Sequence, residues 1–592
     1  MKNEMTLKEG IKKLLETIMT EKYLFWGSMV LMLLTTLGRL LDPLVIAHIV
    51  DTSVPNDDIG DIFVWGGAYA VVILLSGLTS YLQIIMMAKL GVKLITNLKY
   101  KIFSHLLFLP VGWFDKNPVG SLISRVESDC ERVKDLFSHF SVTVISNILY
   151  FAGVLAVLLY RDWKVTLTLF VPMALVLVTA IFVIKYLTKY YKKSRELNAD
   201  ITSRLTEYIQ GIHIVQLFNQ QKKAEDYINE KSGEKRKVDS IASFIEFGAW
   251  GVNDFLIQTV LIILIVLTMA PKILVGDGVV TIGALIIFIQ YSVRLVWPII
   301  QISENLNQFQ RAFVSLRRVY GLLDEDTEND TDGNEITSQA TFQHDIVFEN
   351  VWFKYKEDEW VLKDVSFTIK KGSKVALVGA SGSGKTTTVS LLCRFYDIQK
   401  GRILVDGVDI YQLPLAQWRK KIGLILQDII LFPGNLLENI RIYDDNIAEE
   451  KVVESIIVSH ATPLLQRLDN DILSEIKERG QNLSMGERQL ISFARAICFE
   501  PEVVIMDEAT ASIDAKTEAM IQTSMERLLD GKTAVIVAHR LASVVDCDEI
   551  LFFDNGEIIA RGTHQQLLAT SEEYQNLVQL QFMHNEVNKE NK

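Results

Sequence analysis

A glycine-rich segment that ends in a lysine is the part of this chain most suited to chemistry. Gly379-Ala380-Ser381-Gly382-Ser383-Gly384-Lys385-Thr386 follows the strand-like run 374–378 and matches the pattern G-x-x-x-x-G-K-[ST]. Glycines in such a loop let backbone N–H groups close around phosphate oxygens, and the next helix points its positive dipole end at them. We expect Lys385 to bring positive charge to the outer phosphates of a nucleotide, and the Thr386 hydroxyl to complete a magnesium shell.

A pair of acidic residues follows a second apolar run. Residues 503–506 precede Asp507 and Glu508, as expected for a buried strand that delivers carboxylates to its exposed end. In that position Asp507 can hold magnesium, directly or through water, and Glu508 can orient the attacking water. The alternative, a solvated acidic turn, is disfavoured in a chain with a phosphate-binding loop. The two segments together predict hydrolysis of a nucleoside triphosphate.

The first half of the chain carries apolar stretches of membrane-spanning length. A helix needs about 20 mostly apolar residues to cross a bilayer. Six stretches qualify: 23–50, 62–87, 138–160, 165–187, 255–275 and 279–301. The alternative is a set of buried helices in a large soluble protein, which would be reasonable for one such stretch but is improbable for six.

The orientation of these spans follows from where Lys and Arg collect. The first loop, 51–61, holds four aspartates and no basic residue, whereas Lys and Arg crowd 89–134 and 185–237. Because basic residues stay on the cytoplasmic side, we expect the two long loops and both termini to lie in the cytoplasm of a multi-pass cell-membrane protein.

The two long inner loops are predicted to be helical extensions of the spans. Apolar residues recur at helical spacing through 88–108 and 201–218. Each loop could then present a short transverse turn to the soluble domain. The candidates are 114–118 and 202–208.

Several ionisable residues fall in or near the spans. Arg39 and Asp42 are three residues apart, so they share a helix face and could pair. Glu246, Asp254 and Arg294 lie in or near the fifth and sixth spans. Such charges usually face a bundle interior or an aqueous cavity. Two interpretations therefore stay open: a substrate or gating surface, and a structural ion pair.

Composition and charge divide the chain into four parts. Residues 1–22 form an amphipathic N-terminal helix on the inner membrane surface, 23–323 the membrane domain, 324–341 an acidic linker, and 342–592 a soluble α/β domain. The linker is polar and is expected not to pack. A formal net charge of -12 argues against nucleic acid as the partner. The cysteines show no metal-ligand spacing and are expected to be free thiols; they are Cys130, Cys393, Cys498 and Cys547.

Six motifs in order make the chain resemble the ATP-binding-cassette family. They are the phosphate loop 379–386, 427–432, the signature segment 483–489, 507–508, 511–514 and 538–540. With six preceding spans, the chain resembles the half-transporters of multidrug exporters. The resemblance implies an α-helical membrane domain with six long transmembrane helices, followed by an α/β P-loop nucleotide-binding domain with a helical subdomain. ATP and Mg²⁺ are the implied cofactors.

The resemblance also implies roles for single residues. Glu508 matches the catalytic carboxylate, His539 the switch residue at the γ-phosphate, and Gln427 the residue that contacts magnesium and the water. Tyr355 matches the aromatic that stacks on adenine, and Asp514 the acid that communicates across the dimer. The implied metal ligands are Thr386, Gln427 and Asp507. The implied nucleotide contacts are residues 379–386 with Thr387, Tyr355, Gln427, Asp507, Ser484, Gly486, Glu487 and Asp514.

The signature segment departs from the family pattern Leu-Ser-Gly-Gly-Gln. Here it reads Leu483-Ser484-Met485-Gly486-Glu487. Met485 adds a side chain where the backbone approaches the γ-phosphate, and Glu487 puts negative charge near a triphosphate. In this family two cassettes face head to tail, and each ATP lies between the phosphate loop of one and the signature of the other. We therefore expect a heterodimer in which this chain's signature completes a slow site. A homodimer with a harmless variant signature is the alternative.

The leading functional hypothesis is ATP-driven export of hydrophobic or amphipathic compounds. Lipid flipping by a homodimer is an alternative within transport, and a nucleotide-gated channel is disfavoured because Glu508 and His539 imply turnover. Aromatic residues of the spans suit apolar substrates, although they are also common at lipid interfaces. These residues are Trp250, Phe255, Phe288 and Trp297.

Overall fold

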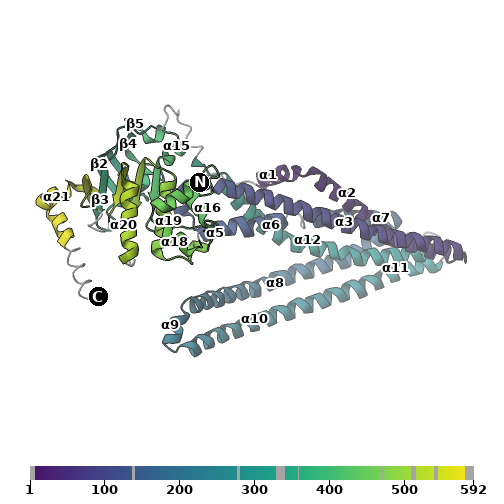
Figure 1. The fold of residues 1–592 in the computed structure, drawn as a ribbon. Helices are drawn as coiled ribbons and strands as arrows, with labels where there is room; N and C mark the ends of the chain where they lie inside the picture. Colours follow the sequence, from purple (N-terminus) through teal and green to yellow (C-terminus); the bar gives the residue numbers. More distant parts are fainter. Residues whose placement is uncertain are drawn as a thin grey trace. The chain divides into compact units, whose positions relative to one another are not determined.

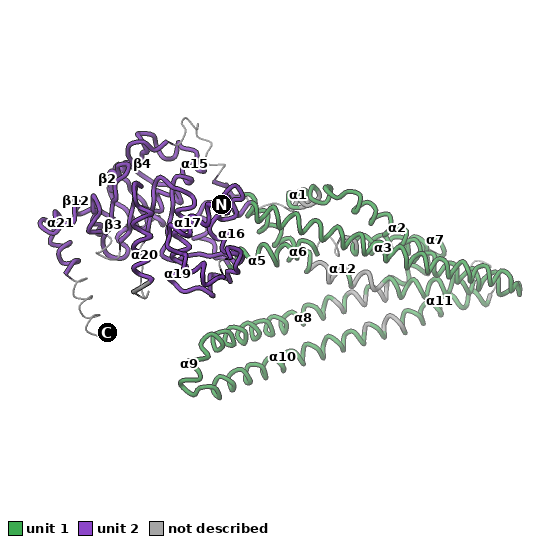
Figure 2. The backbone as a smooth tube through the Cα atoms, viewed as in Figure 1, with its two compact units in different colours: residues 1–104, 120–324 green, residues 105–119, 325–592 purple. Residues whose placement is uncertain are grey.

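The structure of the chain is a computed structural model with two compact units (Figure 2). It describes residues 7–135, 141–275, 281–328, 341–357, 359–469, 471–507, 515–538 and 544–579. The first unit contains residues 1–104 and 120–324, and the second contains 105–119 and 325–592. The short segment 105–119, which lies between the second and third expected spans, therefore belongs with the soluble part of the chain.

The first unit is helical (Figure 1). Its helices are α1 (Leu7–Met19), α2 (Lys22–His48), α3 (Ile59–Leu106), α5 (Val119–Ser124), α6 (Cys130–Asp135), α7 (Ser141–Arg161), α8 (Trp163–Gln210), α9 (Ile212–Leu217), α10 (Gln221–Phe255), α11 (Ile262–Val275) and α12 (Ile282–Leu323). π-helical turns lie at Ile49–Ser53, Arg125–Asp129 and Leu256–Leu261. Helices α3 and α8 have 48 residues each, which at 1.5 Å per residue gives about 70 Å. They are more than twice as long as the hydrocarbon core, so the expected helical extensions are present.

Three helical segments among the described residues are long and apolar enough to cross a membrane. They are Lys22–Ser53, Ile59–Leu106 and Thr143–Arg161. Two shorter apolar segments are Thr259–Leu274 and Ile282–Leu295. The fourth expected stretch, 165–187, lies inside α8. These helices support a membrane domain, while its number of spans stays a prediction.

The second transverse turn was predicted at the wrong place. Residues 202–208 continue α8 without interruption, and the chain turns at α9 instead. Gly211 stops α8, and Asn219 adopts a left-handed backbone with φ 53° before α10 begins. Both residue types tolerate conformations that end a helix, whereas 202–208 contains neither. The first predicted turn, 114–118, overlaps the short helix α4 (Val111–Lys116) of the second unit.

The predicted pairing of Arg39 with Asp42 was also wrong. The Asp42 carboxylate instead forms an ion pair with Arg294 of α12, with 2.7 Å between Nη1 and Oδ2. Helices α2 and α12 pack together, and the Tyr291 hydroxyl donates to the Leu40 carbonyl. This proximity gives Asp42 a partner far away in sequence. Asp42 and Arg294 therefore form an ion pair between two helices.

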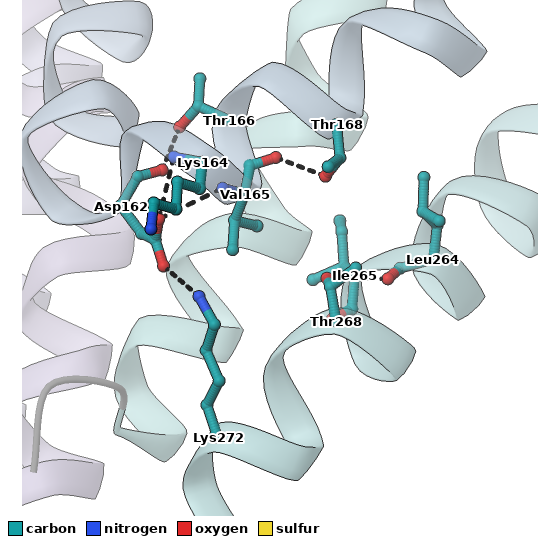
Figure 3. Close-up of polar contacts among 9 residues, drawn as sticks. All are labelled: Asp162, Lys164, Val165, Thr166, Thr168, Leu264, Ile265, Thr268 and Lys272. Atoms are coloured by element: carbon teal, nitrogen blue, oxygen red, sulfur yellow. Dashed lines mark hydrogen bonds and ion pairs between the residues drawn. The ribbon is translucent and has the colours of Figure 1, made fainter. Parts of the chain in front are cut away.

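A polar contact also joins α8 to α11 (Figure 3). Asp162 caps the start of α8, where its Oδ1 accepts hydrogen bonds from the N–H groups of Lys164 and Val165 at 3.0 and 3.2 Å. Its other oxygen accepts from Lys272 Nζ at 2.7 Å. The cap fixes the tight hairpin between α7 and α8, and the lysine ties that hairpin to α11.

The two ends of the membrane unit meet through α1 and α12. Lys13 forms an ion pair of 2.9 Å with Asp324, and the Thr17 hydroxyl lies 2.9 Å from the Tyr320 hydroxyl. The expectation that the linker does not pack is wrong at its start, because Asp324 makes this contact and Glu328 pairs with Arg419 inside the second unit. Residues 329–340 lie outside the described part of the chain.

The second unit is an α/β domain built on a large sheet. Its strand order is β12-β11-β3-β10-β9-β6, and the five strands from β11 to β6 run parallel. Their bounds are β3 (Lys374–Gly379), β6 (Ile422–Ile425), β9 (Val503–Asp507), β10 (Thr533–Val537), β11 (Glu549–Asp554) and β12 (Glu557–Gly562). Strand β10 is fully buried, as expected for a parallel sheet covered on both faces. Side chains at the ends of these strands are therefore the ones placed for chemistry.

A second, antiparallel sheet and two groups of helices complete this unit. The sheet order is β2-β1-β4-β5, from β1 (Asp345–Phe353), β2 (Leu362–Lys370), β4 (Lys400–Val405) and β5 (Val408–Asp409). A two-stranded sheet joins β7 (Gly434–Asn435) and β8 (Glu475–Ile476). The helices are α14 (Lys385–Leu392), α15 (Leu415–Lys420), α16 (Leu436–Arg441), α17 (Glu449–Val458), α18 (Thr462–Arg467), α19 (Met485–Cys498), α20 (Ala515–Leu529) and α21 (His564–Thr570). Helices α16 to α19 pack on one another as a helical subdomain. All four cysteines lie outside disulfides, as predicted, and all four are buried.

Candidate nucleotide-binding site

The parallel sheet gathers the predicted site at one edge. Strands β3, β10, β9 and β6 are neighbours, and their carboxyl ends meet there. The phosphate loop follows β3, Asp507 ends β9, and Gln427 follows β6. Ligands of open α/β sheets bind outside the carboxyl ends of the strands. Glu508, Asp514 and His539 lie outside the described residues, so their roles stay predictions.

The backbone of the phosphate loop requires its glycines. Gly379, Gly382 and Gly384 have φ of 150°, 81° and 106°, which side-chain-bearing residues rarely adopt. A Cβ at Gly379 would lie 2.1 Å from the carbonyl oxygen of Phe553, and one at Gly384 would lie 2.5 Å from Leu362. Gly384 occupies the N-cap position of α14 and has no side chain that could cap the helix. The first N–H groups of α14 are thus left for a ligand.

Lys385 lies folded over this loop. Its ammonium group donates to the carbonyl oxygens of Gly379 and Ala380 at 2.8 and 2.7 Å. The side chain is buried, and this burial lowers the pKa of Lys385, while the charge of Asp507 opposes the shift. A buried cation beside free helix N–H groups is an arrangement that attracts a polyphosphate.

Three oxygen-bearing side chains surround the loop at the sheet edge. Thr386 is exposed at the start of α14, and Gln427 is exposed after β6. Asp507 ends the neighbouring strand, where Ile425 is the register partner of Met506. Hydroxyl, amide and carboxylate oxygens are the ligands that Mg²⁺ prefers, with phosphate oxygens and waters completing its shell. The donor set therefore fits magnesium.

Tyr355 presents an aromatic ring beside the phosphate loop. Its side chain is 43% exposed, and its hydroxyl lies 3.1 Å from the hydroxyl of Thr387. The ring packs edge-on against Phe353 and Tyr396, with centroid distances of 4.8 and 5.0 Å. An aromatic ring supported at its edges and open to solvent suits stacking on a nucleotide base.

Sequence reasoning missed the neighbours of this ring. The Tyr396 hydroxyl donates to Asp115 of α4, and burial together with this hydrogen bond raises the pKa of Tyr396. Close by, Arg419 forms a two-pronged ion pair with Glu328 at 2.7 and 3.0 Å. These contacts attach α4 and the start of the linker to the soluble domain. No local pattern could have indicated them, because the partners are far apart in sequence.

The signature segment forms the start of α19. The Ser484 hydroxyl accepts a hydrogen bond from the Glu487 N–H at 3.2 Å, and Glu487 accepts one from the Ser484 N–H at 2.8 Å. This capping box is joined by Arg467 of α18, whose Nε lies 2.7 Å from the Glu487 carboxylate. Met485 is 37% exposed at the first helical position. The Glu487 charge is thus already paired, and the expectation of a weak site depends more on Met485.

Two family descriptions match the two parts of the chain. Residues 25–299 match the family described as the ABC transporter transmembrane region, and residues 362–511 match the family described as ABC transporter. The probable multidrug resistance ABC transporter ATP-binding/permease protein YheH of Bacillus subtilis is 34% identical over 83% of this chain and 72% of its own length.

Two further relatives extend the similarity. The uncharacterized ABC transporter ATP-binding protein YknV of Bacillus subtilis is 33% identical over 94% of this chain and 91% of its own length. The ATP-dependent lipid A-core flippase of Haemophilus ducreyi is 33% identical over 86% of this chain and 87% of its own length. The similarity to each relative spans both the helical unit and the α/β unit.

Proposed function

This chain belongs to the ATP-binding-cassette transporter family and couples ATP hydrolysis to export across a membrane, and from that premise we propose what it carries and how it is assembled. Its cargo is a class of hydrophobic or amphipathic compounds such as drugs. The observation that supports an ATP-driven membrane exporter is one chain holding both apolar helices of membrane-spanning length and a phosphate loop. The name of the Bacillus subtilis relative YheH supports the same class of cargo.

The membrane part, residues 23–323, has six spans. Three of these spans are the long apolar helices, and residues 165–187 of α8 form the fourth. The fifth and sixth spans contain the two shorter apolar segments, Thr259–Leu274 and Ile282–Leu295. Helices α8 and α10 extend beyond the bilayer and return through α9. The distribution of Lys and Arg puts α9, both termini and the cassette, residues 342–592, in the cytoplasm.

Each residue of the nucleotide site has a separate task. Thr386, Gln427 and Asp507 hold Mg²⁺, which neutralises phosphate charge when it is bound. Lys385 and the loop amides bind the phosphates, and Tyr355 stacks on the base. Glu508 orients the attacking water, His539 contacts the γ-phosphate, and Asp514 communicates across the dimer. Ser484, Gly486 and Glu487 belong to the signature that faces the ATP of the partner chain.

The transporter is a heterodimer with a second half-transporter. The departure at Met485 contrasts with an intact phosphate loop and an intact Asp507-Glu508 pair. This contrast is expected where this chain's phosphate loop pairs with an intact signature on a different chain and forms an active site with it. A homodimer that flips lipids is the second candidate, and the similarity to the Haemophilus ducreyi flippase favours it.

Transport into inverted membrane vesicles tests the pump. ATP should drive accumulation of a fluorescent amphipathic dye, and Glu508→Gln should abolish it while ATP binding persists. Glu502→Gln, which changes a half-buried ion-paired acid near the start of β9, is the matched control. Dye accumulation that survives Glu508→Gln would contradict the pump. A labelled lipid moved in place of the dye would favour the flippase.

Intact-mass analysis of the tagged chain, gently extracted from its native membrane, tests the assembly. A second half-transporter at equal stoichiometry is the expected result. Recovery of copies of this chain alone would mean that the variant signature works in both sites.

A further inference from the structure

The carboxylate of Glu487 is held by two different groups. One oxygen accepts the Ser484 N–H at 2.8 Å, and the other accepts Arg467 Nε at 2.7 Å. Arg467 is the last residue of α18, and Glu487 lies in the first turn of α19. The side chain of Glu487 is 22% exposed and that of Arg467 is 48% exposed. The pair therefore lies at the protein surface, beside the signature segment.

A second basic residue lies at this helix start. Arg488 donates to the Arg479 carbonyl at 3.3 Å and lies 3.5 Å from the Met485 sulfur. The helix dipole adds positive potential at the same end. A carboxylate that turned outward would cancel part of this potential and repel a phosphate. A carboxylate that turns back onto its own helix stabilises the helix start instead.

We propose that Arg467 is a positioning residue that keeps Glu487 turned onto α19, so that the variant signature still accepts the γ-phosphate of ATP. The inference rests on the proposed function, because that ATP is the one held by the phosphate loop of the facing chain. It concerns binding alone, since Arg467 acts through Glu487 and not on the reacting atoms. A second site that binds ATP without rapid turnover is the consequence.

The expected effect is modest because the ion pair is partly exposed. Arg467→Gln leaves Glu487 held by the Ser484 N–H alone and removes a nearby positive charge. Pairs of this exposure contribute little, so affinity at this site should fall about two- to fivefold. Glu487→Gln removes the charge and keeps an amide able to form the capping box. In that background, Arg467→Gln should have little further effect.

The test is a titration of radiolabelled ATP, with Mg²⁺, on the intact transporter purified through a tag on this chain. All samples carry Glu508→Gln, which stops turnover at the site that uses this chain's phosphate loop. The single variants, the double variant and Arg467→Lys are compared. Arg467→Lys should keep most of the affinity because the positive charge remains. Lys451→Gln, which breaks an ion pair with Glu500 elsewhere in the helical subdomain, is the control and should change nothing.

Two results would overturn the inference. One is an unchanged affinity in Arg467→Gln, and the other is an equal loss whether residue 487 is Glu or Gln. Thermal unfolding of each variant identifies a loss that comes from misfolding, and Arg467→Met, which also lacks the charge and favours a helix, then replaces Arg467→Gln in the comparison with Glu487→Gln. Failure of the proposed heterodimer gives a different result. In a homodimer, Arg467→Gln would lower the ATP affinity of both sites, whereas in a heterodimer it lowers the affinity of one.

Discussion

The cassette contains two helix starts at which we expect phosphates to bind, and they are built in opposite ways. Helix α14 begins after Gly384, which cannot cap it, and three loop residues adopt a left-handed backbone that only glycine adopts easily. Helix α19 begins at Ser484, whose capping box with Glu487 pairs the backbone N–H groups of these two residues. The first start leaves its N–H groups to the ligand. The second pairs two of its N–H groups with its own side chains and therefore depends less on a ligand.

This difference separates two tasks in one domain. An uncapped helix start gains much from a bound phosphate, because the phosphate replaces missing hydrogen bonds. A capped start gains less free energy from a bound phosphate, so its contact with the nucleotide can form and break more easily. The phosphate loop is therefore suited to hold ATP throughout a cycle. The signature segment is suited to engage ATP and release it.

The largest effect should follow removal of the charge at the uncapped start. Lys385→Ala removes a buried ammonium group that faces the loop carbonyls, and hydrogen bonds to charged groups contribute about 1.5–3 kcal/mol. ATP affinity at that site should fall about ten- to a hundredfold. Equilibrium binding of ATP to the purified transporter measures this loss. A loss no larger than that of Arg467→Gln would contradict the distinction between the two helix starts.

A gain is expected at the capped start when its added side chain is removed. Met485→Gly with Glu487→Gln restores the pattern Leu-Ser-Gly-Gly-Gln and lets the backbone approach the γ-phosphate. With Glu508→Gln silencing the other site, the remaining ATPase rate should rise about tenfold, since bringing one backbone donor within reach of the phosphate can matter this much. Met485→Ala keeps a Cβ and is the matched control. A rate as high in Met485→Ala would show that the length of Met485, and not its Cβ, limits the site.

The capping box itself should contribute about 1 kcal/mol to stability. Ser484→Ala removes the acceptor for the Glu487 N–H. The midpoint of thermal unfolding should fall, and ATP binding at the signature should weaken as well. Thr563→Ala removes the equivalent box at α21, which Thr563 forms with Gln566, and serves as control. Thr563→Ala should lower stability by a similar amount and leave ATP binding unchanged. Weaker ATP binding in Thr563→Ala would show that lost stability alone explains the effect of Ser484→Ala.

Local patterns predicted the phosphate loop and the helix start after it well, and their surroundings poorly. The phosphate loop and Asp507 follow apolar runs that become β3 and β9, because strand pattern and loop composition are encoded within a few residues. The turn at 202–208 was misplaced because apolar spacing continues through it, and Gly211 decides where α8 ends. The pairs Asp42–Arg294 and Arg467–Glu487 join separate helices. Such contacts depend on tertiary packing, which one sequence does not encode locally.

The smallest effect concerns protons at the uncapped start. Burial lowers the pKa of Lys385 from its ordinary 10.5, and a bound phosphate, by favouring the ammonium form, should raise it again. At pH values above the lowered pKa, ATP binding must then take up a proton, so affinity should fall as pH rises toward the pKa of the complex. Below the lowered pKa, Lys385 is charged in both states and contributes no pH dependence.

Calorimetry of ATP binding at alkaline pH, in two buffers of different ionisation enthalpy, measures this proton uptake directly. Lys385→Arg is the matched control, because a guanidinium stays charged throughout the accessible range and should bind ATP without proton uptake. Equal uptake by both proteins would place the titrating group elsewhere in the site. Proton uptake by the unchanged protein and none by Lys385→Arg would show that Lys385 is the group that gains a proton when phosphate binds.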